Sequence, residues 1–598
     1  MPVPYFRKFE GNFPQTASAM SARREAVWHL LAGITVGLGA YYLWWRWTQS
    51  LNPDALLFST AVALAETAAY LGSLLFFYDI WREDDTPWQS PPTTRREACL
   101  EGDGSITVDL FITTYDEEVD VVEPSVLDAL KLVVPKQTRL TIHVLDDGDR
   151  PIIAQMAKRH GVNYISRQEN TGFKAGNLRN ALFRTSGDFL VICDADTRVL
   201  PGMLMNTLGY FRAPDVAWVQ TPHWFYDIPE GQDWARWLAA RKIPFPNVLA
   251  SLFRFASGKA RVGADPYLSN SGLFFDVIQR RRNRHGASFC CGAGSIHRRE
   301  AIFENALQQK SNAVRRLSQK TGAEPRSVAG TQSLQPYRFH VSEDIYTSIL
   351  LHSDSTRHWR SVYHPGPQAR MLSPWSIDAW TTQKLKYAGG TFDIMLRANP
   401  LFRRGMKWQT KLHYLATFWS YLGVLWMPVL LLAPVVAMFT GIAPVEAYSL
   451  AFFLHLVPLL VANELAVSVG CKQHDPGPGR LLAIATLPIQ LRAFVMVLRG
   501  KRPRFPPTPK TPGSRAEYRR VYPNIAVLAL FIAAAIVGVL NYLRGAEGFT
   551  EPVLIVNLFW LGWNALAMVR AILAAGWTDP EPQSQSHAGV EADAVVHA

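Results

Sequence analysis

Long apolar runs alternate with polar stretches along the chain. A helix needs about 20 consecutive apolar residues to span a bilayer. Runs of about this length occur at Ala26–Trp45, Leu56–Tyr78, Leu412–Thr440, Tyr448–Val469, Ile525–Leu543 and Val553–Leu573. We therefore predict about six membrane-spanning helices, with the longest polar stretch inserted between the second and the third.

That polar stretch has a different pattern. Short runs rich in β-branched residues, "VDLFITTYDEE", "RLTIHVLDDGDR" and "DFLVICDADTRV", are separated by helical segments. This alternation predicts an α/β domain with a largely parallel sheet. The three runs end in the carboxylates Asp116 and Glu117, Asp146 and Asp147, and Asp194 and Asp196. Ligands bind beyond the carboxyl ends of such strands, so these acidic ends should meet in one crevice.

The distribution of charge predicts the orientation in the membrane. Arg23 and Arg24 precede the first apolar run, and no small-residue cleavage site follows it, so this run should stay as an anchor. The positive-inside rule then places the N-terminus, residues 79–411 and residues 470–524 in the cytoplasm. The net charge of +12 agrees with this topology and with an anionic substrate, whereas nucleic acid is not an expected partner.

Cysteine usage and the C-terminal composition add two expectations. The five cysteines fall in the predicted cytoplasmic segments and show no C-x-x-C spacing, so they should be reduced and structural. The end of the chain, "TDPEPQSQSHAGVEADAVVHA", is rich in Pro, Ser, Gln and acidic residues and is predicted to be disordered.

The segment Asp194-Ala195-Asp196 is the sharpest candidate for a metal site. Two carboxylates at i and i+2 at a strand end can reach one hard cation and leave positions for diphosphate oxygens. Mg²⁺ or Mn²⁺ there would neutralise the charge of a departing nucleoside diphosphate. In "NTGFKAGNLRNAL", Lys174 and Asn177 lie near the start of a predicted helix, which is a natural place for phosphate.

The stretch "HVSEDIYTSILLH" predicts a helix with Ser342 as its cap and Glu343 and Asp344 in its first turn. Acidic residues there stabilise the helix through its dipole. Asp344 could instead remove a proton from an acceptor hydroxyl as a general base. These residues by themselves leave both readings open.

Taken together, the motifs resemble those of the processive family 2 glycosyltransferases, and specifically bacterial cellulose synthase catalytic subunits. That family carries D-D-G, D-x-D, T-E-D and Q-x-x-R-W in this order within a GT-A fold. The corresponding stretches here are Asp146-Asp147-Gly148, Asp194-Ala195-Asp196, Ser342-Glu343-Asp344 and Gln383-Lys384-Leu385-Lys386-Tyr387. The likeness extends through "KAGNLRNAL", "QTPHWFYD", "FCCGAGS" and "FPPTPK", from about Asp79 to Lys510.

The resemblance implies roles for individual residues. Residues expected to bind the uridine are Tyr115, Asp146 and Asp147. Residues expected to bind the diphosphate are Lys174 and Lys386. Asp194 and Asp196 would bind the metal, and Asp344 would be the base, with Glu343 beside it in the substrate site. Residues expected to bind the growing glycan chain are Gln383 and Tyr387. A gating loop that closes over the nucleotide would contain Phe505, Thr508 and Lys510.

The expected fold is an α/β GT-A-type cytoplasmic glycosyltransferase domain inserted between about six α-helical transmembrane segments. The predicted order is an N-terminal segment 1–25, two spans in 26–78, the catalytic domain 79–373, interfacial helices 374–411, spans in 412–469, an interfacial helix and gating loop 470–524, spans in 525–573, and a tail 574–598.

Several features depart from the family pattern. Residues 301–339 look like an insertion before Asp344, and Thr197 stands where a histidine near the metal is usual. No PilZ-like segment follows the last apolar run, so regulation by cyclic-di-GMP on this chain is not expected. Lys386 and Tyr387 replace the usual Arg and Trp, which lets the acceptor ring sit differently and suggests a linkage other than pure β-1,4, with β-1,3 first among them.

The expected function is an inverting, metal-dependent synthase that polymerises glucose from UDP-glucose and moves the glycan across the bacterial inner membrane, with a possible periplasmic accessory subunit. One alternative keeps the enzyme class but uses a UDP-N-acetylhexosamine, as chitin or hyaluronan synthases do, or is nonprocessive. Another is a transporter or receptor with a nucleotide-binding module. Glu66 and Glu464 lie within predicted spans and could either pair with neighbours or line a sugar path.

Overall fold

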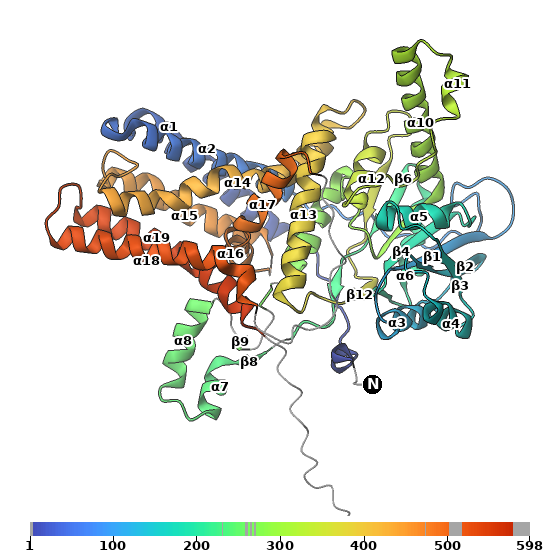
Figure 1. Cartoon of the computed structure of the whole chain (residues 1–598), viewed down its shortest axis with the longest axis horizontal. Coiled ribbons are helices and arrows are strands. Elements are labelled where there is room, and N and C mark those ends of the chain that lie inside the picture. Colours follow the sequence, from blue (N-terminus) through green and yellow to red (C-terminus); the bar gives the residue numbers. More distant parts are fainter. Residues whose placement is uncertain are drawn as a thin grey trace, which may run out of the picture.

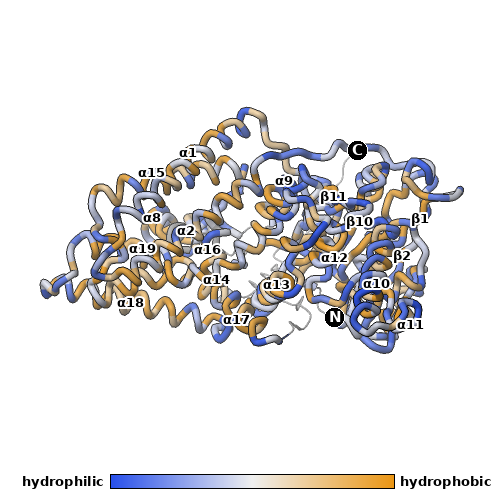
Figure 2. Tube along the Cα trace, turned by 90° about the horizontal axis from the view of Figure 1, so that it is seen from above, coloured by the Kyte–Doolittle hydropathy of each residue, from blue (hydrophilic) through white to orange (hydrophobic). Residues whose placement is uncertain are grey.

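The chain is described by a computed structural model that covers residues 4–229, 231–257, 261–262, 266–267, 271–472, 474–501 and 517–577. A bundle of long helices and an α/β domain lie at opposite ends of the molecule, and helix α13 (Ile377–Arg397) crosses between them (Figure 1). Apolar segments are concentrated in the bundle (Figure 2). This division agrees with the predicted insertion of a polar domain between spans.

The α/β domain is built on a seven-stranded sheet with the order β11-β6-β10-β4-β1-β2-β3. Its strands are β1 (Ile106–Thr114), β2 (Thr138–Asp146), β3 (Asn163–Ser166), β4 (Phe189–Asp194), β6 (Val216–Gln220), β10 (Ser295–Arg298) and β11 (Arg360–Tyr363). Strand β10 is antiparallel to both of its neighbours, whereas the other pairs are parallel. The sheet is therefore mixed rather than uniformly parallel.

Helices and small sheets surround the large sheet. The helices of this domain are α3 (Val119–Ala129), α4 (Pro151–Arg159), α5 (Phe173–Leu182), α6 (Met203–Thr207), α10 (Arg299–Thr321), α11 (Pro325–Ala329) and α12 (Glu343–His352). A three-stranded sheet contains β5 (Arg198–Val199), β12 (Ala369–Met371) and β7 (Trp224–Phe225), and a two-stranded one contains β8 (Gln232–Asp233) and β9 (Arg261–Val262).

Strand β1 shows why its sequence forms a central strand. Val108, Leu110 and Ile112 pack into the core on one face of the sheet, and Phe111 packs into a separate core on the other face. Side chains alternate between the two faces of a strand, and a strand covered on both faces needs apolar residues on both. The run "VDLFITT" meets this requirement.

Within the described residues, six helices are long and apolar enough to cross a membrane, as predicted. They are α1 (Ala22–Gln49), α2 (Leu56–Asp79), α14 (Trp408–Thr440), α15 (Leu450–Gly470), α18 (Tyr522–Leu543) and α19 (Glu551–Ala575). The pair α16 (Gly477–Ala485) and α17 (Leu487–Leu498) is apolar as well and is bent by 53°, which gives a seventh span if the pair is counted as one. The hydropathy pattern did not identify this pair as a membrane segment.

The carboxylates in the spans have basic partners. Arg46 is fully buried, and its Nε donates to Glu66 Oε2 at 2.8 Å, while its Nη2 donates to the carbonyl of Pro444 at 2.8 Å. Glu464 Oε2 lies 2.5 Å from Arg480 Nη1. The structure therefore favours the pairing of these carboxylates over a sugar path.

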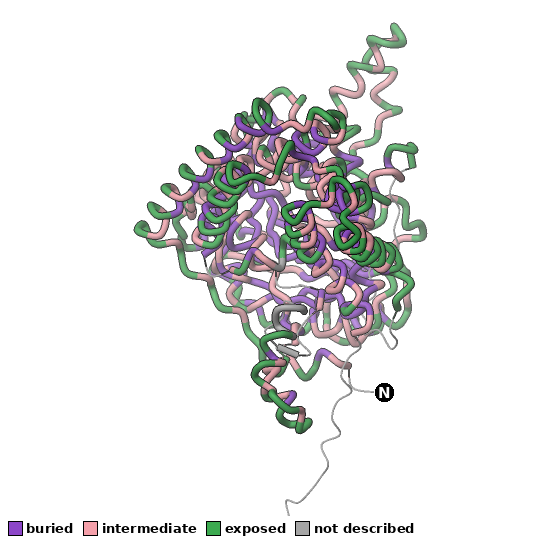
Figure 3. The backbone as a smooth tube through the Cα atoms, turned by 90° about the vertical axis from the view of Figure 1, so that its left-hand side faces the viewer, coloured by how far each residue is buried: buried purple, intermediate pink, exposed green. Residues whose placement is uncertain are grey.

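Two helical arms project from the body of the molecule (Figures 1 and 3). One is the pair α10 and α11, which occupies the segment predicted to be an insertion. The other is formed by α7 (Trp234–Ala240) and α8 (Pro246–Ser257). All five cysteines are free, as expected. The predicted disordered tail lies almost wholly outside the described residues, although α19 extends to Ala575.

Candidate active site

The acidic strand ends do meet at one edge of the sheet. In the parallel pair β1 and β2, Thr114 lies opposite Asp146, and in the pair β1 and β4, Thr113 lies opposite Asp194. Tyr115 follows directly on β1, and its side chain is 41% exposed. The three strands therefore bring their terminal residues together at one edge of the sheet, where the sequence predicted the crevice.

Asp146 organises the turn after β2. It is fully buried and accepts hydrogen bonds from the N–H groups of Gly148 (3.0 Å) and Arg150 (2.8 Å), from the Tyr164 hydroxyl (3.0 Å) and from the Arg150 side chain (3.0 Å). A Cβ at Gly148 would lie 2.3 Å from the carbonyl oxygen of Tyr115, so the turn requires glycine. The main role of Asp146 is therefore to hold the turn after β2 in place.

Asp147 and Arg167 form an ion pair on the same wall. Arg167 Nη2 donates to Asp147 Oδ2 at 2.8 Å, and both side chains are largely buried. A paired Arg and Asp together carry no net charge. A base or ribose group that enters here would hydrogen-bond to a neutral, fixed pair.

Lys174 and Asp194 form the second ion pair of the site. Lys174 stands in the first turn of α5, and its Nζ contacts Asp194 Oδ1. Burial opposes the charged form of Lys174, but the carboxylates of Asp194, Glu343 and Asp344 outweigh this effect and raise its pKa. Lys174 is therefore a permanent positive charge, as a diphosphate ligand must be.

Asn177 does not take part in phosphate binding as the sequence suggested. It is buried, and its Nδ2 donates to the carbonyl of Leu145 in β2 at 2.9 Å. The reason is geometric: Asn177 lies one helical turn beyond Lys174 and faces the sheet rather than the crevice. Its amide braces α5 against β2.

Asp194 and Asp196 differ in their surroundings. The Asp194 side chain is 46% exposed, whereas Asp196 is buried and accepts the N–H of Leu372 at 3.1 Å. Among the described residues, no group of three or more His, Cys, Asp or Glu side chains is placed to hold a metal ion. The two carboxylates are hard oxygen donors and fit a divalent cation whose remaining ligands are diphosphate oxygens and water.

A glycine turn brings Asp344 to this centre. Gly292, in "FCCGAGS", has φ +87°, and a Cβ placed there would lie 3.5 Å from Lys174 Nζ and 3.6 Å from Asp344 Oδ2. The Cys290 N–H donates to Ser348 Oγ in α12 at 2.8 Å, which ties the turn to that helix. Lys174 and Asp344 therefore lie on either side of Gly292, which has no side chain to separate them. Asp194 forms an ion pair with Lys174.

Asp344 lies in the first turn of α12, as predicted. Its Oδ1 accepts the N–H of Ile345 at 2.8 Å, and Oδ2 is directed toward Gly292. Burial raises the pKa values of both Glu343 and Asp344, and each carboxylate lies in the negative field of others. A carboxylate with a raised pKa is a stronger base than an exposed aspartate.

The expectation that Ser342 caps α12 with its side chain is wrong. Ser342 makes no side-chain cap hydrogen bond, because its hydroxyl points at α13 instead. A Cβ on Gly390 of α13 would lie 2.0 Å from Ser342 Oγ, so only glycine permits this approach. The close contact sets the distance between α13 and the catalytic helix.

His340 joins the same two helices. Its Nδ1 accepts the N–H of Ser342 at 3.0 Å, and its Nε2 lies 3.0 Å from Asp393 Oδ2 on α13. The sequence offered no signal for this role, because His340 and Asp393 are 53 residues apart and belong to no common motif. With Gly390, this bridge fixes the start of α12 against the middle of α13.

The predicted acceptor residues lie on α13. Tyr387 is 50% exposed, Lys384 Nζ lies 5.9 Å from its ring centroid, and Gln383 is half-buried one turn earlier on the same face. Tyr387 on α13 and Asp344 on α12 belong to helices that touch where Gly390 meets Ser342. Lys386 is half-buried on the same helix. Phe505, Thr508 and Lys510 of the expected gating loop lie outside the described residues.

The N-terminal segment contacts residues next to the site, which the sequence did not predict. The Tyr5 hydroxyl donates to Asp227 Oδ2 at 3.0 Å, and the Ser373 N–H donates to Asp227 Oδ1 at 2.8 Å. Burial raises the pKa of Asp227 to about 6. Ser373 directly follows Leu372, whose N–H donates to Asp196. Through Asp227, Tyr5 is therefore connected to the residues that position Asp196, the second aspartate of the D-x-D turn.

Glu10 of the same segment completes this connection. It pairs with Arg198 at 2.5 Å and with Arg370 at 3.2 Å, and both arginines also contact Asp128. Arg198 begins β5, two residues after Asp196. The N-terminal segment therefore fastens the turn that carries Asp194 and Asp196 to the rest of the domain.

Comparison with known proteins identifies the class of enzyme that the chain resembles. Residues 109–303 match the model of glycosyl transferase family 2. Cellulose synthase 1 of Komagataeibacter xylinus is 27% identical over 581 residues, which cover 95% of this chain and 33% of that protein. The cellulose synthase catalytic subunit [UDP-forming] of Pseudomonas fluorescens (strain SBW25) is 28% identical over 433 residues, 71% of this chain and 50% of that protein.

Among the solved structures that the chain matches is the mannosyltransferase from Pyrobaculum calidifontis in complex with GDP-Man and Mn²⁺. It is 16% identical with a TM-score of 0.42, and the match covers 74% of this chain and 100% of that one. The chain spans about a third to a half of the length of the curated relatives described above.

The sheet, the acidic crevice and the matched domain define a glycosyltransferase with a GT-A-like fold. Residues 109–303 match the family 2 model, and most of the chain resembles the catalytic subunits of cellulose synthases. This confirms the enzyme class and the family resemblance that the sequence motifs predicted.

Proposed function

We propose that the protein is an inverting, processive β-glycan synthase that polymerises glucose from UDP-glucose. The catalytic domain works on the cytoplasmic side of the bacterial inner membrane, and the membrane helices pass the polymer outward. The observation that carries the proposal is that Lys174 contacts Asp194 and faces Asp344 across Gly292, beside helix α13, which carries Tyr387. Relatives named as UDP-forming cellulose synthases support the choice of donor.

The chemistry follows from the positions of the side chains. Asp344 Oδ2 accepts the proton of the acceptor hydroxyl, whose oxygen attacks the anomeric carbon of the donor as the bond to the diphosphate breaks. The attack comes from the face opposite the leaving group and inverts the configuration. Lys174 neutralises the departing diphosphate, and Tyr387 offers a flat apolar face to the terminal sugar ring. A bound Mg²⁺ or Mn²⁺, held by Asp194 and Asp196, would stabilise the same leaving charge as a Lewis acid.

The direct test is synthesis from labelled sugar nucleotides by the purified full chain. We expect UDP release from UDP-glucose and a polymer that a β-1,3-specific glucanase degrades, because Lys386 and Tyr387 alter the acceptor platform. UDP release from UDP-N-acetylglucosamine alone would overturn the choice of donor. A product cut only by a β-1,4-specific enzyme would overturn the linkage and leave the enzyme class intact.

Tyr387→Ala should shorten the product more than it slows donor hydrolysis. The tyrosine is expected to touch the acceptor sugar and not the nucleotide, so its loss should reduce polymer yield by about tenfold to a hundredfold while UDP binding stays within about twofold. Tyr387→Phe keeps the ring and should retain most activity. Equal polymer lengths in wild type and Tyr387→Ala would exclude the acceptor role.

Glu10→Gln should weaken the use of metal without abolishing turnover. The change removes the charged partner of Arg198 beside the D-x-D turn. We expect the metal concentration for half-maximal activity to rise by about tenfold, the lower end of the effect of losing a charge-assisted hydrogen bond worth about 1.5–3 kcal/mol. Glu101→Gln, on an exposed loop, is the matched control. A lower melting temperature with an unchanged metal titration would mean that Glu10 only stabilises the fold.

A further inference from the structure

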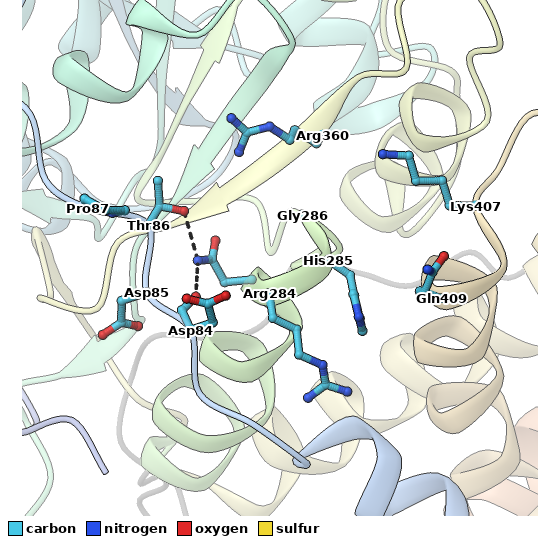
Figure 4. A pocket seen from close by; sticks show the side chains of 11 residues that line it. Asp84, Asp85, Thr86, Pro87, Arg284, His285, Gly286, Arg360, Lys407 and Gln409 are labelled. Carbon is cyan, nitrogen blue, oxygen red and sulfur yellow. Dashed lines mark hydrogen bonds between the residues drawn. The ribbon is translucent and has the colours of Figure 1, made fainter. Parts of the chain in front are cut away.

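A cavity of about 440 Å³ lies away from the crevice, between the α/β domain and the first spans. Its walls come from residues 84–87, from residues 283–286, from Arg360 and from the two ends of the short stretch Lys407–Gln409 (Figure 4). These segments are distant in the sequence and include no residue assigned to catalysis. A volume of this size is in the usual range for small-ligand sites.

The cavity lies beside the ends of two candidate membrane spans, α2 and α14. Helix α2 ends at Asp79, a few residues before the wall formed by 84–87, and α14 begins at Trp408 within the opposite wall. Trp408 is 63% exposed and Trp81 is 41% exposed. Tryptophan at the ends of spans is typical of the headgroup region of a bilayer. If α2 and α14 span a bilayer, as their length and apolar composition allow, the cavity lies at its headgroup region.

Two opposite charges in the cavity lack a protein partner. Within the described part of the chain, neither the Lys407 ammonium nor the Asp84 carboxylate forms an ion pair or a hydrogen bond. They stand on opposite sides of the cavity (Figure 4) and do not pair with each other. Asn283 fixes the acidic wall, because its Nδ2 donates to the carbonyl of Asp84 at 2.8 Å and to Thr86 Oγ1 at 3.0 Å.

The other ionisable groups of the cavity are already engaged. Asp85 pairs with Arg280 at 2.6 Å, and Arg360 pairs with Asp215 at 2.7 Å. The Arg284 guanidinium donates to the carbonyl of Asp79 at the end of α2 (3.4 Å) and to that of Arg82 beyond it (3.3 Å). His285 is neutral, because burial and then Arg284 lower its pKa to about 4. Lys407 and Asp84 are therefore the charges that remain for a ligand.

We propose that this cavity binds the zwitterionic headgroup of a membrane phospholipid of the phosphatidylethanolamine type. The phosphate lies at Lys407, and the primary ammonium donates to Asp84. The acyl chains leave past Trp408 along the first turns of α14. A ligand with both charges satisfies both walls, whereas an anionic headgroup would bring its charge near Asp84 without a partner.

The test measures lipid binding by the full chain in detergent with native mass spectrometry. Phosphatidylethanolamine, phosphatidylcholine and phosphatidylglycerol are titrated separately. Phosphatidylethanolamine should bind best, and both Lys407→Gln and Asp84→Asn should weaken it by about tenfold, the effect of losing one charge-assisted contact. Lys411→Gln is the matched control, because it removes the same charge one turn further along α14 and outside the cavity.

Three results would overturn the proposal. Equal binding of all three lipids by wild type and both variants would mean that Lys407 and Asp84 are only solvated charges. Tighter binding of phosphatidylglycerol, lost in Lys407→Gln alone, would assign the cavity to an anionic lipid. Displacement of the lipid by an equal concentration of free phosphoethanolamine would assign it to a soluble ligand. None of these results depends on the polymerisation reaction.

Discussion

Replacing Asp344 by Asn should abolish polymer synthesis while UDP binding persists. The amide has nearly the same shape but cannot accept the proton of the acceptor hydroxyl, and a general base contributes about 10²–10⁴-fold to a reaction rate. We therefore expect polymer yield to fall by about a thousandfold, measured with labelled UDP-glucose. UDP affinity should stay within about threefold, because the base acts in the transition state.

The pH dependence provides a second readout of the same residue. Burial raises the pKa of Asp344 above the ordinary value of 3.8, so the base is protonated and lost at a higher pH than an exposed aspartate would be. The wild-type rate should fall as the pH falls through this raised value. An acid limb at or below about pH 4, the ordinary range of a carboxyl, or Asp344→Asn activity within about tenfold of wild type, would remove Asp344 from the role. Asp103→Asn, on an exposed loop, is the control variant.

The second large effect is expected at Asp196. Asp196→Ala should eliminate turnover and metal dependence together, because the cation would lose one of its two carboxylate ligands and the leaving diphosphate its Lewis acid. We expect a loss of at least about a hundredfold, measured as UDP release during Mn²⁺ and Mg²⁺ titrations, the scale on which lost electrostatic stabilisation acts. Titration curves that match wild type would contradict the metal role.

Asp196 also has a structural bond, so the variant needs a folding control. It accepts the N–H of Leu372, and alanine would leave that buried donor without a partner. Asp196→Asn keeps an acceptor for this bond but is a poorer ligand for a hard cation. Loss of metal dependence in both variants, with the melting temperature of Asp196→Asn close to wild type, would separate metal binding from folding.

Sequence patterns and the tertiary structure contributed different parts of this picture. The six apolar runs and the three acidic strand ends were readable from the sequence, because hydrophobic periodicity and strand direction are local properties. The same applies to the helix that begins at Glu343 with Asp344 in its first turn. Local rules failed at Ser342 and Asn177, whose side chains fit their local patterns but turn toward distant elements.

The sequence by itself therefore determined the six apolar helices, the α/β domain and the acidic residues that meet at the ends of β1, β2 and β4. Only the tertiary structure decided how they are held together: Gly390 and His340 fix α13 on the catalytic helix, Tyr5 reaches Asp227 across 222 residues, and Lys407 comes to face Asp84. The physical reason is that each of these contacts depends on the packing of whole elements. Residues so far apart share no periodicity, and nothing in either local segment indicates the other.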